Sequence, residues 1–312
     1  MEIIKVQEND TNIRLDNFLM KLFPNLSKGY IFKAIRTNKV KVNGKKPKFG
    51  YRLQLNDEIK LFINENVGNN QADNWQLAKD ILDVVYEDVN LLVVNKPAKL
   101  LVNDEKEEIA DTLINRAKKY LFKKNKWDPE KENQFAPCLV HRIDFNTTGL
   151  VMIAKTHEAS VILSQKIKDR EIDKFYQCLV YGKMPQQSQL LEAYWTKPKN
   201  GNLVKISNTS SIDAKHIITK YKVLKYDQKQ DVSLLEVELL TGRTHQIRAH
   251  LAFIGHPLVG EQKYISREIK KKTNFKSQAL VAYKLKFNFK TDAGKLAYLD
   301  KQVIELKNIR LI

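Results

Sequence analysis

The pattern of hydrophobic and polar positions predicts a small unit over residues 12–60. Apolar residues recur with helical spacing over 13–19, and a second amphipathic segment follows Ser27, a residue type that caps helix N-termini. Residues 39–42 alternate between polar and apolar and run into Asn43-Gly44, a strong signal for a hairpin turn, and a further turn and strand follow. The pattern therefore predicts a helix-helix-hairpin unit.

The rest of the chain shows a different pattern. Residues 61–79 are polar and turn-rich without a period, which predicts a flexible linker. Over residues 80–312, apolar strand-like runs alternate with basic amphipathic segments, and the runs lie at 91–95, 150–154, 175–180, 217–224, 233–240 and 285–289. We therefore expect a larger domain of mixed helices and strands, built on a sheet of many strands.

Composition narrows the protein class. A chain of 312 residues with 43% hydrophobic residues can bury the cores of two domains. It has no apolar run of the roughly 20 residues that a membrane span needs, and residues 1–10 lack an apolar signal segment, so we expect a cytoplasmic protein that is not in a membrane. The two cysteines, Cys138 and Cys178, form no Cys-x-x-Cys pair that could hold zinc.

The charge indicates a polyanionic partner. Lysine and arginine number 54 against 36 acidic residues, a net charge of +18, and such a field attracts nucleic acid. A solubilising lysine coat is the simpler alternative. Residues 12–60 alone carry nine lysines and three arginines against three acidic residues, which gives +9. Half of the net charge therefore lies in about a sixth of the chain.

One candidate catalytic stretch is His-Arg-Ile-Asp over residues 141–144, followed by Phe-Asn-Thr-Thr-Gly-Leu and an apolar strand. This order places Asp144 on a loop at the edge of a buried sheet, where catalytic groups are commonly found. From this stretch alone, a structural aspartate that caps the turn is an equal alternative.

Two further stretches could carry chemistry. Residues 241–251 place Arg243 and Arg248 around a glycine-bearing turn between a strand and a helix, which suits an anion. A metal site is a poor alternative, because His245 and His250 are five residues apart and no glutamate lies between them. Residues 170–180 predict a basic strand that carries Tyr176, or simply an ordinary amphipathic strand.

These stretches, together with Asn-Lys-Pro-Ala over 95–98, closely resemble the RluA/RluC/RluD family of pseudouridine synthases over nearly the whole chain. Departures from the family pattern occur at Lys99, Phe145-Asn146 and Thr148. Residues 12–60 resemble the small RNA-binding domain of ribosomal protein S-four, through Arg14-Leu15-Asp16 and Val-Lys-Val-Asn-Gly over 40–44. Here the departures are two asparagines in place of glycine, at Asn38 and Asn56.

The resemblance implies an α+β fold with a central mixed, mainly antiparallel sheet, and an enzyme that needs no cofactor. Asp144 matches the catalytic carboxylate, Arg248 the arginine that pairs with it, and Tyr176 the tyrosine that stacks on the target base. Arg142 matches the residue that enters the RNA helix as the uridine swings out, and Arg243 is assigned to phosphate contact. Whether the carboxylate attacks ribose, attacks uracil or removes a ribose proton stays open.

The expected partner is RNA, namely ribosomal RNA and in particular large-subunit 23S RNA, bound by a monomer. Further residues assigned to RNA contact are His141, Lys174, Arg14, Lys28, Lys33, Arg36 and Lys41. Two alternatives remain: a non-catalytic RNA-binding or ribosome-assembly factor, and the same chemistry on transfer RNA. A phosphate-ester hydrolase would need a metal-binding carboxylate cluster, which the sequence does not contain.

Overall fold

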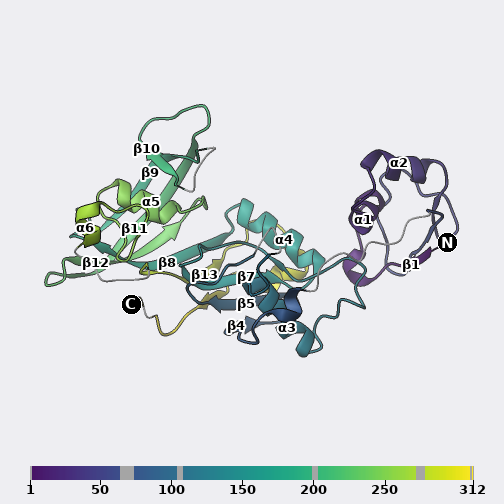
Figure 1. Ribbon diagram of the computed structural model, residues 1–312, viewed down its shortest axis with the longest axis horizontal. Coiled ribbons are helices and arrows are strands. Elements are labelled where there is room, and N and C mark those ends of the chain that lie inside the picture. Colours follow the sequence, from purple (N-terminus) through teal and green to yellow (C-terminus); the bar gives the residue numbers. More distant parts are fainter. Residues whose placement is uncertain are drawn as a thin grey trace.

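The computed structural model describes residues 2–63, 74–103, 108–198, 203–271, 278–309 and 311. Its strands form two sheets, one of three strands and one of eleven. Figure 1 shows the smaller sheet and its two helices at one end of the molecule, beside the larger domain. Helices and a large mixed sheet occur together, which confirms the predicted α+β class.

The N-terminal domain contains the predicted helices and a small antiparallel sheet in the order β1-β3-β2. Its elements are β1 (Glu2–Lys5), the 3-10 helix η1 (Glu8–Asp10), α1 (Leu15–Leu22), α2 (Lys28–Arg36), β2 (Val40–Val42) and β3 (Glu58–Leu61). The Ser27 hydroxyl accepts a hydrogen bond from the Tyr30 amide at 3.2 Å, as a helix cap does. Strand β1 pairs with β3 and extends the domain before the expected start at residue 12, which the periodicity did not indicate.

Three positions where the families that the sequence resembles usually have glycine adopt the left-handed backbone conformation. Asn38 and Asn56 have φ values of 62° and 67°, and Lys99 has a φ of 60°. Asparagine tolerates this conformation better than most residues, whereas lysine at such a position is unusual. The turns therefore keep their shape without glycine.

The larger sheet has the strand order β10-β9-β11-β12-β8-β13-β7-β5-β4, with β14 and β6 paired beside β13 and β7. Its strands are β4 (Val84–Glu87), β5 (Leu91–Lys96), β6 (Cys138–Leu139), β7 (Thr148–Ala154), β8 (Ile172–Tyr181), β9 (Ser188–Thr196), β10 (Lys205–Ser207), β11 (Lys215–Asp227), β12 (Val232–Leu239), β13 (Leu280–Phe287) and β14 (Val303–Glu305). The helical elements of this domain are η2 (Asn74–Leu77), α3 (Leu113–Lys123), α4 (His157–Lys168), α5 (Gln246–Phe253), α6 (Arg267–Lys271) and η3 (Gly294–Leu299). All the described strand pairs are antiparallel except β13 with β7, so the predicted mixed, mainly antiparallel sheet is confirmed. Within the described residues, none of these helices is long and apolar enough to cross a membrane.

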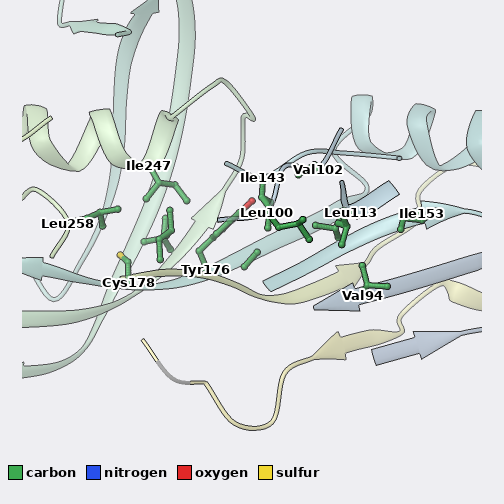
Figure 2. Close-up of a cluster of buried hydrophobic side chains, with 14 of the residues drawn as sticks. Val94, Leu100, Val102, Leu113, Ile143, Ile153, Tyr176, Cys178, Ile247 and Leu258 are labelled. Atoms are coloured by element: carbon green, nitrogen blue, oxygen red, sulfur yellow. The ribbon is translucent and has the colours of Figure 1, made fainter. Parts of the chain in front are cut away.

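Strands β5 and β7 are buried on both faces, which explains their continuous apolar sequences. In β5, Leu92 and Val94 belong to one hydrophobic cluster, while Leu91 and Val93 belong to another on the opposite face. Figure 2 shows part of the first cluster, in which Tyr176 lies among aliphatic side chains. The two clusters therefore pack on opposite faces of the centre of the sheet, and the loop that carries Asp144 leads into the central strand β7.

The N-terminal domain contacts the larger domain directly. The Asn133 side-chain amide donates to the Lys5 carbonyl at 2.8 Å, and the His157 amide donates to Asn9 Oδ1 at 3.1 Å. Most of the predicted linker, residues 64–73, lies outside the described residues. At its far end, Trp75 is buried in the core of the larger domain against Trp127. Residues near the end of the expected linker thus belong structurally to the larger domain.

Gly149, near the start of β7, allows this strand to lie very close to β13. It has a φ of +111°, and a Cβ at this position would lie 2.1 Å from the Ala282 carbonyl oxygen of β13. The two residues are partners in the parallel pairing of β7 and β13. Only glycine permits this close approach, which sets the position of the loop that precedes β7.

We predict that Gly149→Ala destabilises the protein more than Gly255→Ala does. Gly255 also has a positive φ, of +89°, but nothing lies within 4 Å of the position that a Cβ would occupy there. Both substitutions place alanine at a positive φ, which should lower the free energy of unfolding by about 1–2 kcal/mol. At Gly149 the clash with Ala282 should lower it by about 1–3 kcal/mol more. Urea unfolding of both variants measures the difference, and equal losses would contradict the close packing of β7 on β13.

Candidate active site

A cleft of about 1490 Å³ collects the candidate residues of the larger domain. Its walls come from the loop before β7, from β8, and from the turn that leads into α5. Asp144, Tyr176 and Arg248 all line this cleft, although they are far apart in the sequence. The antiparallel pairing of β8 with β12 brings Tyr176 beside Val237, close to the end of β12 from which α5 follows.

Arg248 joins two carboxylates, Asp144 in the lining of the cleft and the fully buried Glu261. Its NH1 donates to Asp144 Oδ2 at 2.9 Å, while its Nε and NH2 donate to the two oxygens of Glu261 at 2.8 and 2.7 Å. Glu261 also accepts the backbone amides of Gln262 and Lys263 at 3.0 and 2.9 Å. The two-pronged interaction of the guanidinium is therefore made with Glu261, a residue that the sequence analysis did not single out.

Burial and charge have opposite effects on the pKa values of Arg248 and Glu261. Burial disfavours the charges of Arg248 and Glu261, but their mutual hydrogen bonds outweigh it, so the pKa of Arg248 is raised and that of Glu261 is lowered. Asp144 adds to the rise in the pKa of Arg248. Both members of the buried pair are thus ionised at neutral pH, and a fixed positive charge faces Asp144.

Tyr176 presents a neutral phenol to the cleft. Its side chain is mostly buried, and burial, followed by the charge of Asp144, raises its pKa above the ordinary value. A phenol of this kind stays protonated at neutral pH, so it can donate a hydrogen bond or stack on a flat ring. Its position in the same cleft as Asp144 suits contact with a planar, polar substrate.

His245 and Tyr264 complete the surroundings of Asp144. His245 Nε2 lies 3.9 Å from Asp144 Oδ2, and its Nδ1 is 2.7 Å from the Tyr264 hydroxyl. His245 precedes α5 with a φ of 55°, and burial lowers its pKa despite the opposing effect of Asp144. The Arg248 guanidinium lies 5.5 Å from the centre of the Tyr264 ring. From the sequence, His245 was of interest only as a possible metal ligand, and no local signal indicated this arrangement.

Lys96 anchors the loop that carries Asp144. Its buried Nζ donates to the carbonyls of Pro97, Leu100 and Phe145 at 2.7, 2.9 and 3.0 Å. Burial lowers its pKa to about 8, and the charge of Asp144 opposes this. The ammonium is therefore largely protonated at neutral pH, and its three donors match the three acceptors. The Asn-Lys-Pro-Ala motif could have indicated this anchor.

His141 also has a structural partner. The Met152 amide of β7 donates to His141 Nε2 at 3.2 Å. Burial, and then the charge of Lys174, lowers the pKa of His141 to about 3, so its ring is neutral at physiological pH. A neutral histidine that accepts a backbone hydrogen bond positions the loop and adds no positive charge for RNA.

The other predicted RNA-contact residues fall into two groups. Arg142, Lys174 and Arg243 line the cleft, and Lys174 Nζ lies close to the backbone turn at Gly242. The predicted RNA-contact residues of the N-terminal domain do not line the cleft. They are Arg14, Lys28, Lys33, Arg36 and Lys41. The molecule thus offers two basic surfaces, one around Asp144 and one on the small domain.

The donor set of the cleft does not suggest a metal centre. Among the residues that the structure describes, no group of three histidine, cysteine or acidic side chains could hold a metal ion. Asp144 and Glu261 are both engaged by Arg248, whose charge would repel a cation. The chemistry available is that of a carboxylate, a guanidinium and a phenol.

Comparisons with known proteins agree with this site. The family described as RNA pseudouridylate synthase matches residues 90–253, and the S4 domain matches residues 13–59. An uncharacterized RNA pseudouridine synthase of Mycoplasma genitalium is 36% identical over 286 residues, which cover 90% of this chain and 88% of the relative. Ribosomal large subunit pseudouridine synthase C of Rickettsia prowazekii is 35% identical over 276 residues, 83% of this chain and 86% of the relative.

A solved structure supports the fold. Human RNA pseudouridylate synthase domain containing 1 superposes with a TM-score of 0.56 at 24% identity, covering 68% of this chain and 81% of that chain. At this level of identity the likeness concerns the arrangement of strands and helices alone. It agrees with the sheet described above.

We predict that Glu261→Gln destabilises the protein by about 3 kcal/mol near neutral pH, because it removes the charge of the buried carboxylate that accepts two hydrogen bonds from Arg248. The folded pKa of Glu261 lies below its ordinary value of 4.5, so its contribution is present above that pH and is lost as the pH falls through the folded pKa. The stability gap between wild type and variant should therefore narrow between about pH 6 and about pH 3. Denaturant unfolding across this range measures the gap, with Glu130→Gln, at an exposed carboxylate, as the control. A gap independent of pH would contradict the assignment.

Proposed function

Because the chain belongs to the RNA pseudouridylate synthase family, we propose that it converts uridine to pseudouridine in large-subunit ribosomal RNA, with Asp144 as the catalytic carboxylate. The observation that carries this proposal is the Asp144–Arg248 pair in a basic cleft that Tyr176 also lines. Enzymes of this family are isomerases, and the overall reaction adds and removes no atoms.

The reaction breaks the N-glycosidic bond, turns the uracil and forms a new bond to carbon 5. We propose that Asp144 acts as nucleophile on ribose or uracil, or as the base that removes a ribose proton. Arg248 orients this carboxylate through a hydrogen bond at 2.9 Å, because the guanidinium is itself fixed by Glu261 and cannot turn away. Tyr176 would stack on the extruded base, and its neutral hydroxyl can donate to a uracil carbonyl.

The basic residues of the cleft suit the RNA around the target. We propose that Arg142, which is exposed beside Asp144, enters the space that the flipped uridine leaves. Arg243 and Lys174 flank the turn before α5 and would contact phosphates. All of these groups come from one chain, which is consistent with a monomer acting on cytoplasmic RNA.

The ribosomal substrate is proposed from the named relatives and the N-terminal domain. A relative that is 35% identical carries the name ribosomal large subunit pseudouridine synthase C. The S4 domain over residues 13–59 supplies a second RNA-binding unit beside the cleft. The same chemistry on transfer RNA is the alternative. A non-catalytic assembly factor is disfavoured, because such a protein has no need for an ion-paired carboxylate in a cleft.

We predict that Asp144→Asn folds and binds RNA but forms pseudouridine at least about 10³-fold more slowly, within the range for loss of a positioned acid or base. Folding should survive, because Glu261 alone still pairs with Arg248 through two hydrogen bonds. Single-turnover assays on ribosomal RNA fragments give the rate. Asp213→Asn, at an exposed aspartate outside the cleft, is the matched control and should keep full activity. Near-normal rates for Asp144→Asn would exclude Asp144 as the catalytic group.

A second prediction concerns the substrate. Pseudouridine sequencing of total RNA from cells with the gene, without it, and with the Asp144→Asn form should show sites in large-subunit ribosomal RNA that only the wild-type gene produces. Loss of sites confined to transfer RNA would replace the ribosomal proposal with its alternative and leave the chemistry unchanged.

A further inference from the structure

We propose that Phe32 and Phe49 of the N-terminal domain form a stacking site for an unpaired nucleobase of the bound RNA. This inference rests on the proposed function only in that the ligand is RNA, and it assigns a base-binding role to a surface far from Asp144 in sequence. The two rings lie with centroids 6.2 Å apart and planes inclined by 27°. They border a pocket of about 440 Å³ between α2 and the loop over residues 46–51.

The exposure of Phe49 is the first argument. Its side chain is 83% exposed, although burial of a phenylalanine is worth about 1.5–3 kcal/mol. The small domain has an apolar core that contains Phe18 and Phe23, so the fold does bury aromatic rings where it can. A large aromatic ring that is held at the surface beside a pocket is typical of a binding site.

The backbone that carries Phe49 is well anchored, so the ring is presented in a defined position. The Tyr51 amide donates to the Lys48 carbonyl at 3.1 Å, and the Leu15 amide donates to the Tyr51 carbonyl at 2.8 Å. The Tyr51 hydroxyl donates to Asp57 at 2.8 Å, which ties the loop to the start of β3. A ring fixed in this way loses little entropy when a base stacks on it.

Charge around the pocket identifies the class of ligand. Four basic residues contribute to its lining, namely Lys33, Arg36, Lys46 and Lys48. The Arg14 guanidinium lies 5.6 Å from the centre of the Phe49 ring, and Lys28 Nζ lies 5.8 Å from that of Phe32. The acidic residue in the lining, Asp16, accepts two hydrogen bonds from Arg14 and is thereby neutralised. The site therefore combines aromatic faces with an excess of positive charge.

Single-stranded RNA matches this combination better than a duplex or an apolar peptide. Bases in a duplex already stack on their neighbours, whereas an unpaired base can stack on an exposed aromatic ring while its phosphates contact lysine and arginine. An apolar peptide would fill the pocket but would leave the basic rim without counterions. We therefore assign the pocket to a nucleotide in a loop, bulge or single-stranded flank of the RNA.

The test uses the full-length protein and a 12-nucleotide single-stranded RNA that carries 2-aminopurine, whose fluorescence falls when the base stacks. Phe49→Ala should weaken binding of this RNA about 5- to 100-fold and reduce the fluorescence change, in line with the loss of one stacked base. Phe49→Trp should retain both. For a duplex of the same sequence, the affinities of wild type and Phe49→Ala should differ by less than about twofold.

A charge variant separates stacking from phosphate contact. The double variant Lys33→Ala/Lys48→Ala should weaken the binding of both single-stranded and duplex RNA. For the single strand, it should also lower the slope of log affinity against log salt by about 1.4, whereas Phe49→Ala should leave this slope unchanged. Thermal melts check folding, which Phe49→Ala should not disturb because the ring is exposed. Unchanged single-strand affinity in Phe49→Ala, or equal losses for both RNA forms, would overturn the stacking site. Since binding is measured without turnover, an inactive enzyme would refute the proposed function and leave this result standing.

Discussion

The hydrogen-bonded group Asp144–Arg248–Glu261 is the interaction on which the cleft depends. A guanidinium buried in the wall of a domain needs compensating charge, and Glu261 supplies it through two hydrogen bonds while the backbone amides of residues 262 and 263 hold Glu261 in place. Arg248 therefore has a fixed direction before substrate arrives. Its remaining amino group can then orient Asp144 without ordering cost when the substrate binds.

The loop that carries Asp144 is fixed from three sides. Gly149 lets β7 approach β13 within a distance that no side chain would permit, Lys96 binds the carbonyl of Phe145, and His141 accepts the amide of Met152. Each of these contacts is made by a residue in or close to the loop or its motifs. The position of the carboxylate is thus a property of the central sheet.

Positive charge is divided between the cleft of the larger domain and the pocket of the N-terminal domain. The cleft is lined by Arg142, Lys174 and Arg243 together with Asp144, and the N-terminal domain presents its own lysines and arginines around Phe32 and Phe49. Contacts such as Asn133 with the Lys5 carbonyl seat the small domain against the larger one. An RNA that reaches both surfaces gains affinity from the second without any change in the chemistry at the first.

The sequence by itself determined the fold class, the helix-helix-hairpin order, and the stretches that surround the site, because apolar periodicity and long local motifs are readable without contacts. It did not reveal β1, whose four residues acquire meaning only by pairing with β3. Nor did it reveal Glu261, His245 beside Asp144, or the exposed Phe49, since nothing local distinguishes them from ordinary polar or apolar residues. Their roles were decided by the tertiary structure, because ion pairs, close approaches and exposure depend on which distant segments the sheet brings together.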